Sequence, residues 1–408
     1  MINAIVGQSG GPTAAINASL SGVIRGCRES GKIDVLYGSF YGVQGVFDEH
    51  FCRLFDVVAD EECHLSLETT PASALGSCRK KLPPPTPENE ETYKKLFDVF
   101  GKYEIKYFFY IGGNDSMDTV HKLSVWAEYI NSDIRFIGVP KTIDNDLSHT
   151  DHTPGFGSAA KYLATSCAEM IRDTEVYTTD AVTIIEIMGR DAGWLTACSA
   201  LARIVDGTAP DFVYLPEVAF DVECFVSDVK EKLKDKHNVV VAVSEGVRDE
   251  NGVYVGESSQ SGKTDAFGHK YLSGTGKTLE EIVRDRIGCK VRSVEINILQ
   301  RCASHLGSKT DIDESVMVGK FAVELALDGK TGTMAAFQRV SDNPYKCECI
   351  GVDLGKVANA VRSVPVEFIT PDKNNVTDEC LEWILPLVQG EISPKFENGL
   401  PVHFIIKR

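Results

Sequence analysis

The chain has 408 residues, enough for two or three domains, and its 43% hydrophobic and 25% charged residues are typical of an ordinary globular protein. Its formal net charge of −17 argues against nucleic acid and anionic membranes as partners, because both would repel an acidic protein. Small anionic ligands stay compatible with this charge, since a local cluster of Arg and Lys can bind phosphate.

Neither a targeting segment nor a membrane span is expected. The N-terminal run "MINAIVGQSGG" carries no basic region, and no uninterrupted stretch of about 18 apolar residues occurs in the sequence. The twelve cysteines are scattered without a CxxC pair. We therefore expect reduced thiols in a cytoplasmic protein and no disulfide framework.

Short apolar runs predict six strands, at residues 2–6, 106–111, 134–139, 182–187, 211–215 and 238–243. Several runs are almost continuously hydrophobic, which is typical of parallel strands that are buried on both faces. Segments with helical periodicity, such as 14–27 and 116–130, lie between them. This alternation predicts an α/β fold with two units of similar size that divide near residue 140.

The residues that directly follow each strand are informative, because open parallel sheets bind ligands beyond the carboxyl ends of their strands. Two strand ends are glycine-rich turns that open helices, "GQSGGPTAAIN" (7–17) and "GGNDSMDT" (112–119). Glycine allows close approach of the backbone to a ligand, and a helix N-terminus attracts phosphate. A tight turn or a capped helix would explain either one alone.

The strand end "PKTIDNDLSH" (140–149) places Lys141 before a run of acidic and amide residues. A polar loop is one interpretation, and a site where a cation, a base and a metal-binding carboxylate converge is the other. Further strand ends carry Arg190 in "MGRDAGWLTA" and Glu245 in "SEG", while Arg292 lies just before the last apolar run. Five such ends together predict a cleft where a sugar phosphate meets a phosphoryl donor.

Two other segments, "SGKT" (261–264) and "TGKT" (275–278), look like the end of a P-loop. That motif requires a glycine five positions before its second glycine, and Glu257 and Tyr271 stand there instead. Neither segment follows a strand-like run. We therefore reject both as phosphate-binding loops.

The chain resembles the phosphofructokinase family through most of its length. The resemblance is carried, in the family's order, by "GQSGGPTAAIN", "LGSCRKK" (75–81), "GGNDS", "PKTIDND", "MGRDAGWL", "PEV" (216–218), "SEG" and "LQR". It implies two Rossmann-like three-layer α/β domains with mostly parallel sheets and the active site in the cleft between them. The implied division is a phosphoryl-donor domain of residues 1–140 with a returning segment at about 300–360, and a fructose 6-phosphate-binding domain of 141–299 with about 361–408.

Two positions separate family members that use pyrophosphate from those that use ATP, which have glycine where this chain has Asp115 and Lys141. A carboxylate at Asp115 would crowd and repel an ATP α-phosphate, and Lys141 can stabilise the transferred phosphoryl group. The resemblance therefore implies a reversible, pyrophosphate-dependent phosphotransferase of glycolysis and gluconeogenesis that makes fructose 1,6-bisphosphate and phosphate. An ATP-dependent kinase and a non-catalytic sugar-phosphate sensor are the alternatives.

The matching motifs imply roles for individual residues. The implied catalytic residues are Asp144 as general base, Lys141, Asp115 and Arg190. The implied substrate-binding residues are Thr142, Ile143, Asp144, Met188, Gly189, Arg190, Glu245, Arg292 and Arg301, the last two as a clamp on the 6-phosphate. The implied donor-binding residues are Gly11, Arg79, Gly113, Asp115, Ser116 and Lys141. The implied metal is Mg²⁺, with Asn114 and Asp146 as its candidate ligands.

Three positions depart from the family pattern. Asn114 stands where many members carry Asp. The neutral amide oxygen of Asn is a weaker ligand for Mg²⁺ than the carboxylate of Asp. Ile298 replaces the usual His or Tyr, so one hydrogen bond to the sugar phosphate is missing or comes from another residue. The family suggests a homodimer or homotetramer, but Ala181 stands where ATP-dependent relatives place an arginine that crosses a subunit interface.

Overall fold

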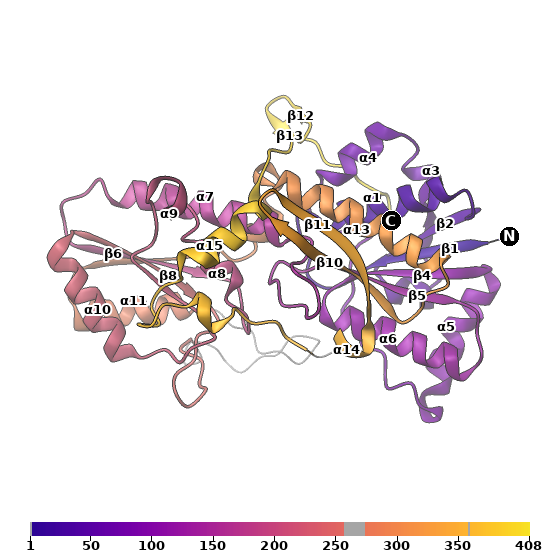
Figure 1. Ribbon diagram of the computed structural model, residues 1–408, viewed down its shortest axis with the longest axis horizontal. Helices are drawn as coiled ribbons and strands as arrows, with labels where there is room; N and C mark the ends of the chain where they lie inside the picture. Colours follow the sequence, from indigo (N-terminus) through magenta and orange to yellow (C-terminus); the bar gives the residue numbers. More distant parts are fainter. Residues whose placement is uncertain (1, 257–273, 358–359) are drawn as a thin grey trace.

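The computed structural model describes residues 2–256, 274–357 and 360–408 (Figure 1). Two sheets lie side by side along its longest axis. The first consists, in spatial order, of β11 (Tyr345–Asp353), β10 (Thr333–Asp342), β5 (Arg135–Pro140), β4 (Ile105–Gly112), β1 (Asn3–Gln8), β2 (Val35–Ser39) and β3 (Phe51–Arg53). The second consists of β7 (Phe212–Tyr214), β8 (Asn238–Ser244), β6 (Ala181–Ile187) and β9 (Lys290–Glu295).

The predicted α/β class with mostly parallel sheets is confirmed. Every pair in the second sheet is parallel, and in the first sheet only β2–β3 and β10–β11 are antiparallel. The six strands that the apolar runs predict are all present, with ends that differ by at most two residues. The reason is that both faces of these parallel strands are covered, which requires continuous hydrophobicity.

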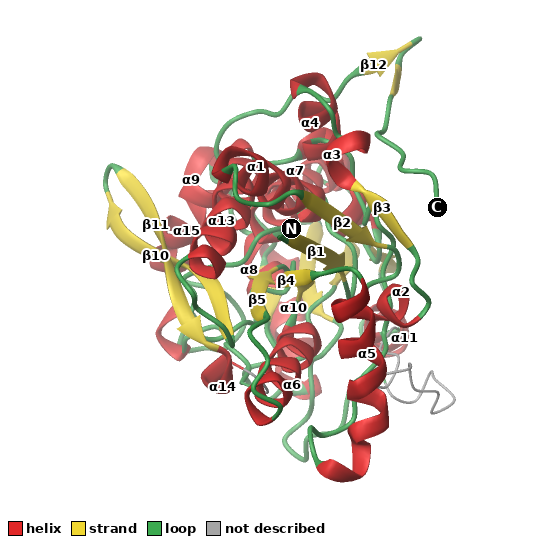
Figure 2. Ribbon diagram, turned by 90° about the vertical axis from the view of Figure 1, so that its right-hand side faces the viewer, coloured by secondary structure: helices red, strands yellow, loops and turns green. Residues whose placement is uncertain are grey.

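The first sheet is sandwiched between two helical layers (Figure 2). On one face lie α1 (Ile16–Ser30) and α13 (Lys309–Leu327), whose apolar residues share a core with alternate strand residues such as Val6. On the other face lie α5 (Glu90–Lys102) and α6 (Asn114–Tyr129), which pack with Ile5. The alternation of Ile5 and Val6 follows from the two-residue period of a strand.

Helices α1 and α13 approach each other so closely that glycine is required at their crossing. A Cβ atom on Gly22 would lie 2.2 Å from the Val316 carbonyl oxygen, and one on Gly319 would lie 2.3 Å from the Ser19 carbonyl oxygen. These contacts seat α13 firmly on the first sheet, although it follows the second sheet in sequence.

The second sheet is also covered on both faces. Helices α7 (Phe156–Thr174), α8 (Trp194–Cys198) and α15 (Asp378–Ile384) share one core with it, and α10 (Val222–Asp235) and α11 (Thr275–Arg286) share the other. The remaining elements are α2 (Val43–Phe47), α3 (Leu54–Val57), α4 (Glu61–Glu68), α9 (Arg203–Asp206), α12 (Leu299–Cys302), α14 (Leu354–Val357), β12 (Phe396–Glu397) and β13 (Leu400–Pro401). Short 3₁₀ turns occupy Pro87–Asn89, Ser304–Leu306, Val366–Phe368 and Leu385–Val388.

The course of the C-terminal part departs from the domain division given above, whose boundaries stay a prediction. Residues 364–387 contribute to the core of the second sheet. Phe404 and Ile406, however, pack into the core of the first sheet, and the Phe404 N–H donates to Thr70 Oγ1 at 2.8 Å. The last residues therefore pack with the first sheet and not with the second.

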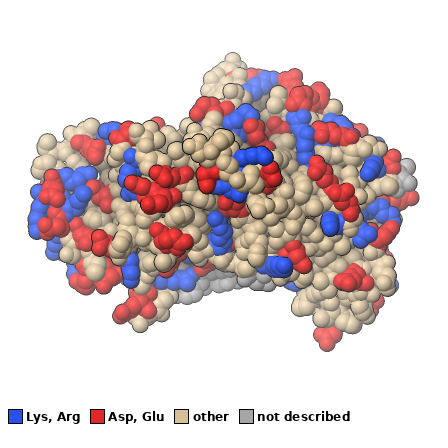
Figure 3. Space-filling view, viewed as in Figure 1, with Lys and Arg blue, Asp and Glu red and all other residues tan. Residues whose placement is uncertain are grey.

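The rejected P-loop segment 275–278 forms the first turn of α11, and 261–264 lies outside the described residues. Figure 3 shows Lys and Arg interspersed with Asp and Glu over one face of the molecule. None of the helices in the described part of the chain combines the length and the apolar character that a membrane crossing requires.

Candidate active site

Strand ends from both sheets line a single cleft of about 480 Å³. The predicted site residues along its wall are Gly11, Arg79, Gly113, Asn114, Asp115, Ser116, Lys141, Thr142, Ile143, Asp144, Asp146, Met188, Arg190 and Arg301. They come from six separate segments of sequence, and most of these segments meet because parallel strands expose their carboxyl ends on the same edge of a sheet.

Gly189 and Glu245 were also predicted to belong to the site, and they lie just behind this wall. The Gly189 N–H donates to Glu245 Oε1 at 3.5 Å. Burial, together with repulsion from the nearby Asp144 charge, raises the pKa of Glu245 to about 8. Ser244 Oγ donates to the Gly189 carbonyl, so the "SEG" and "MGR" segments are bonded to each other.

Arg292 does not line the cleft of its own chain. It lies near the start of β9, paired with Thr183, whereas the cleft is at the opposite, carboxyl end of β6. Arg292 instead borders a smaller pocket that also contains Tyr177 and Ala181. Sequence spacing alone placed Arg292 and Arg301 on either side of one apolar run, but the chain turns between them, so only Arg301 reaches the cleft.

Lys141 lines the cleft and is almost fully buried, with 3% of its surface exposed. Its Nζ donates to the Gly11 carbonyl oxygen at 2.6 Å, which joins the end of β5 to the turn after β1. Gly10 adopts a φ of +77°, a left-handed conformation that favours glycine, and an added Cβ would lie 3.2 Å from that Nζ. Burial lowers the pKa of Lys141 to about 8, with Arg301 and Arg79 adding repulsion and Asp144 opposing it.

Asp144 and Asp146 follow Lys141 and are both turned into the cleft. Asn145 between them has a φ of +54°, a conformation that Asn tolerates better than most residues. Burial and repulsion from Asp146 raise the pKa of Asp144 well above its usual range, although Lys141 opposes this shift. Burial raises the pKa of Asp146 as well. Such shifts in a cleft are typical of catalytic carboxylates.

Asp115 lies in the first turn of α6 and lines the cleft. Lys81 Nζ pairs with its Oδ1 at 3.0 Å. Sequence reasoning missed Lys81, although it ends the quoted "LGSCRKK" segment, two residues after Arg79. The alternation of Arg79 and Lys81 in an extended segment was the available signal.

Several other cleft residues were not predicted, namely Gly10, Pro12, Thr13, Asp191, Ala192 and Val361. All but one lie within motifs that the sequence already indicated. Val361 is the exception, since no motif surrounds it. It is brought to the cleft by a bridge to Leu147 and by the Arg362 N–H, which donates to the Asp146 carbonyl oxygen at 2.8 Å.

The cleft can also hold a divalent metal ion. Asn114 Nδ2 donates to Asp146 Oδ2 at 3.1 Å, which orients the amide of Asn114. The other end of that amide, Oδ1, is buried and accepts no hydrogen bond within the described structure. An unsatisfied buried oxygen beside a carboxylate fits a hard cation that prefers oxygen ligands.

Comparison with known proteins agrees with this geometry. The chain matches the family described as Phosphofructokinase over residues 3–326. It is 43% identical to a pyrophosphate–fructose 6-phosphate 1-phosphotransferase of Halomonas elongata, with 98% of this chain and 94% of that protein covered. A protein of the same name from Methylococcus capsulatus is 39% identical, with the same coverage.

A solved structure supports the same assignment. The crystal structure of a pyrophosphate-dependent phosphofructokinase from Marinobacter aquaeolei is similar with a TM-score of 0.87 and 35% identity. The similarity covers 100% of this chain and 98% of that one. Sequence, fold and site geometry therefore agree that the chain belongs to the phosphofructokinase family.

Proposed function

We propose that the protein transfers a phosphoryl group from pyrophosphate to the 1-hydroxyl of D-fructose 6-phosphate, giving D-fructose 1,6-bisphosphate and phosphate. The observation that carries this proposal is the arrangement of Lys141 and Asp115 in one cleft, where ATP-dependent members have glycine at both positions. The names of the two curated relatives, at 43% and 39% identity, support the same donor and acceptor.

Asp144 acts as the general base. Its carboxylate accepts the proton of the 1-hydroxyl while that oxygen bonds to the phosphorus of pyrophosphate, and the bridging P–O bond breaks to release phosphate. The raised pKa of Asp144 suits this task, because a base works best when its pKa is close to the working pH. Its backbone N–H donates to Thr142 Oγ1 at 3.1 Å, which fixes the turn that presents it.

Cationic side chains stabilise the charge on the transferred group. Lys141 lies beside Asp144 and is held by Gly11, and Arg190 approaches the same carboxylate from the end of β6. Arg79 lies on the donor side with Gly113 and Ser116 and binds the leaving phosphate. Fixed cations of this kind supply much of the catalysis in phosphoryl transfer.

The acceptor occupies the side of the cleft nearer the second sheet. Glu245 hydrogen-bonds the sugar hydroxyls, and Arg301 binds the 6-phosphate. Thr142, Ile143 and Met188 form the wall on this side, with Gly189 just behind it. Ile298 is 54% exposed and its side chain has no polar atom. Arg301 therefore binds the 6-phosphate without the His or Tyr that many relatives have at this position. Arg301 lies close to the turn after β1, since a Cβ on Gly11 would be 3.1 Å from its Nη1.

Phosphofructokinase-family phosphotransferases generally use a divalent metal, and here we propose Mg²⁺. Asp146 and the Asn114 Oδ1 would hold it, with Asn114 fixed by its own bond to Asp146. The ion would neutralise charge on the phosphate oxygens during transfer.

We also propose a cytoplasmic homodimer or homotetramer. The twelve cysteines are all free, as expected in a reducing compartment. Arg292 borders a surface pocket beside Ala181, the position at which ATP-dependent relatives carry a cross-subunit arginine. In an oligomer, Arg292 would complete the 6-phosphate clamp of a neighbouring subunit.

An assay with each phosphoryl donor distinguishes the proposed function from its alternatives. Purified protein is assayed with fructose 6-phosphate, Mg²⁺ and either pyrophosphate or ATP, and kcat/KM is measured for each donor. We expect pyrophosphate to exceed ATP by about a hundredfold or more. Equal turnover with ATP would favour the ATP-dependent kinase, and fructose 6-phosphate binding without turnover of either donor would favour the non-catalytic sensor.

A further inference from the structure

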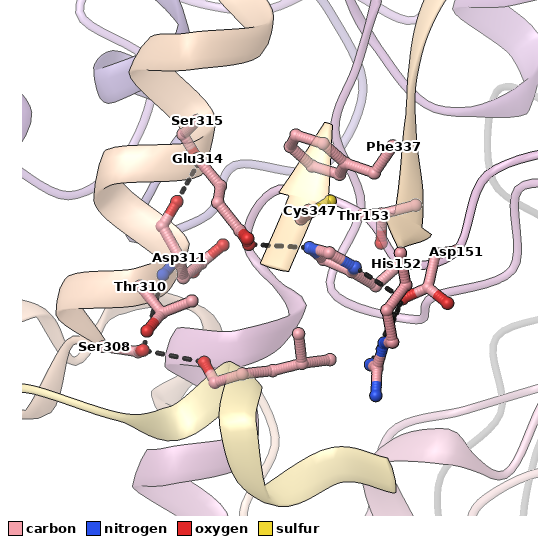
Figure 4. A network of polar contacts seen from close by, with 12 residues as sticks. Asp151, His152, Thr153, Ser308, Thr310, Asp311, Glu314, Ser315, Phe337 and Cys347 are labelled. Atoms are coloured by element: carbon pink, nitrogen blue, oxygen red, sulfur yellow. Dashed lines mark hydrogen bonds and ion pairs between the residues drawn. The ribbon is translucent and has the colours of Figure 1, made fainter. Parts of the chain in front are cut away.

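A buried ion network outside the cleft is centred on His152 (Figure 4). His152 Nδ1 lies 2.9 Å from Asp151 Oδ1, and Nε2 lies 2.8 Å from Glu314 Oε2. Ionised carboxylates only accept hydrogen bonds, so both ring nitrogens donate and the ring is an imidazolium. Burial by itself lowers the pKa of His152, but these two bonds outweigh it and the pKa is raised.

Both carboxylates of this network have a second partner. Tyr345 Oη donates to the second oxygen of Glu314 at 2.8 Å, and Arg339 Nε donates to Asp151 Oδ1 at 3.2 Å. Both carboxylates therefore contact the cation His152, and Asp151 also contacts Arg339, which in turn donates to Asp342 Oδ1 at 3.1 Å. A compensated group of this kind is costly to break, because removing one member leaves a buried charge unpaired.

Cys347 lies close enough to suggest a metal centre, since one ligand atom each from Cys347, His152 and Glu314 fit within 4.8 Å of one another. Two observations argue against a metal. The contact between His152 Nε2 and Glu314 Oε2 is a hydrogen bond, which puts a proton where a metal would have to lie. Burial also raises the pKa of Cys347 to about 12, so its thiol stays protonated.

The network is bonded to the loop that carries Asp144. Residues 141–155 leave β5, turn, and return to α7, and His152 lies on the returning half. The two halves are joined by the Thr142 N–H, which donates to the Pro154 carbonyl oxygen at 3.2 Å, and by Thr153 Oγ1, which donates to the Thr142 carbonyl oxygen at 2.8 Å. Thr142 Oγ1 in turn accepts from the Asp144 N–H.

Helix α13 holds this returning half at two points, one turn apart. Asp311 accepts hydrogen bonds from the Gly155 N–H at 2.8 Å and from the Ser158 N–H at 2.9 Å, which fixes the start of α7. Glu314, three residues later and on the same face of α13, holds His152. Figure 4 shows both acidic side chains turned from α13 toward the returning half.

We propose that Glu314, acting through the charged ring of His152, is a positioning residue for Asp144. Glu314 touches neither substrate nor the cleft wall. It fixes the returning half of the loop, which fixes Thr142, which fixes the turn that presents the base. Phosphoryl transfer depends strongly on the placement of its base, so a small shift of this loop lowers the rate of the chemical step more than it weakens binding.

The test is Glu314→Gln in the full chain, which keeps the shape and removes the charge. We expect kcat to fall about ten- to a hundredfold, while KM for pyrophosphate and for fructose 6-phosphate changes by less than about threefold. Asp313→Asn is the matched control, because Asp313 precedes Glu314 on α13 but is exposed and paired only with Lys309 there. The control keeps the wild-type kcat.

A double-mutant cycle with Asp144→Asn separates positioning from general damage. If Glu314 acts through Asp144, Glu314→Gln lowers kcat in the wild-type background but by less than about twofold in the Asp144→Asn background. An equal loss in both backgrounds, or a wild-type kcat in Glu314→Gln, would overturn the inference. The inference rests on the proposed role of Asp144, whose failure is seen separately as a wild-type kcat in Asp144→Asn alone.

Tyr345→Phe is the alternative test of the positioning role if Glu314→Gln unfolds below the assay temperature. This change removes only the hydroxyl that donates to Glu314 and leaves the ion pair in place. We expect a loss of about threefold in kcat with both KM values unchanged. An unchanged kcat in this folded variant would count against the positioning role as clearly as the first test.

Discussion

Lys81 Nζ lies 3.0 Å from Asp115 Oδ1, so a cation from the segment before α5 is paired with the first turn of α6 at the edge of the cleft. The two side chains are 45% and 35% exposed, and an ion pair this open to solvent contributes about 1 kcal/mol or less to stability. The pair matters because both of its side chains line the cleft. The pair puts an anion and a cation next to each other on the side of the cleft where we propose that the donor binds.

Replacing Lys81 tests whether this cation serves the donor. Lys81→Met keeps the length of the side chain and removes its charge, so we expect KM for pyrophosphate to rise about tenfold, the effect of losing one charge-assisted contact. KM for fructose 6-phosphate stays unchanged, because Lys81 lies on the donor side. Initial-rate kinetics with each substrate varied gives both values.

Lys80→Met is the matched control for that experiment. Lys80 is adjacent in sequence, but its Nζ donates to Gln44 Oε1 at 2.9 Å and lies over the Phe47 ring, away from the cleft. We expect wild-type kinetics. If KM for pyrophosphate rises equally in the two variants, the cause is the loss of a positive surface charge and not a specific contact of Lys81 with the donor.

Replacing Asp115 tests how ATP is rejected. Asp115→Gly removes both the bulk and the charge that would meet an ATP α-phosphate, and we expect kcat/KM for ATP to rise about tenfold or more. Asp115→Asn removes only the charge, so its gain is smaller if crowding contributes. Adding Lys141→Gly extends the test to both positions. No gain of ATP use in any of these variants would contradict the explanation.

The pKa of Lys141 predicts an alkaline limit to activity. That pKa is lowered to about 8, so the charge on Lys141 is present below that pH and is lost as the pH rises through it. We therefore expect kcat/KM for pyrophosphate to fall as the pH rises above about 8. On the acidic side it falls as Asp144 takes up a proton, at a pH well above the usual range of an aspartate.

Lys141→Arg identifies the alkaline group, because arginine stays charged at every pH used. We expect the alkaline decline to move upward by more than one pH unit or to disappear. A decline that stays near pH 8 in Lys141→Arg, or a wild-type enzyme that keeps full activity up to pH 10, would assign the alkaline limit to another group. The full pH profile of kcat/KM is the measurement.

The crossing of α1 and α13 predicts a stability difference between two glycines. Gly22→Ala forces a Cβ to within 2.2 Å of a backbone oxygen, so we expect the free energy of unfolding to fall by about 1–3 kcal/mol. Gly101→Ala, in helix α5, meets nothing within 4 Å and should be neutral or stabilising by up to about 1 kcal/mol. Denaturant unfolding compares the two, and equal effects would refute the packing explanation.

Much of this protein could be predicted from local sequence. The strands that became β1, β4, β5, β6, β7 and β8 were recognisable because strands that are buried on both faces are mostly apolar along their length. The glycine turns and the segment from Lys141 to Asp146 were recognisable because close ligand approach and phosphate chemistry restrict the residue types. These features depend on residues within a few positions of one another.

The tertiary structure alone decided which distant residues share the cleft. It paired Lys81 with Asp115 and placed Val361 in the cleft wall. It also placed Arg292 near the start of β9, away from the cleft. It also placed Glu314 against His152, which lies 162 residues earlier. Such contacts depend on how the helices and the two sheets pack, and no local pattern of polarity or spacing encodes that packing.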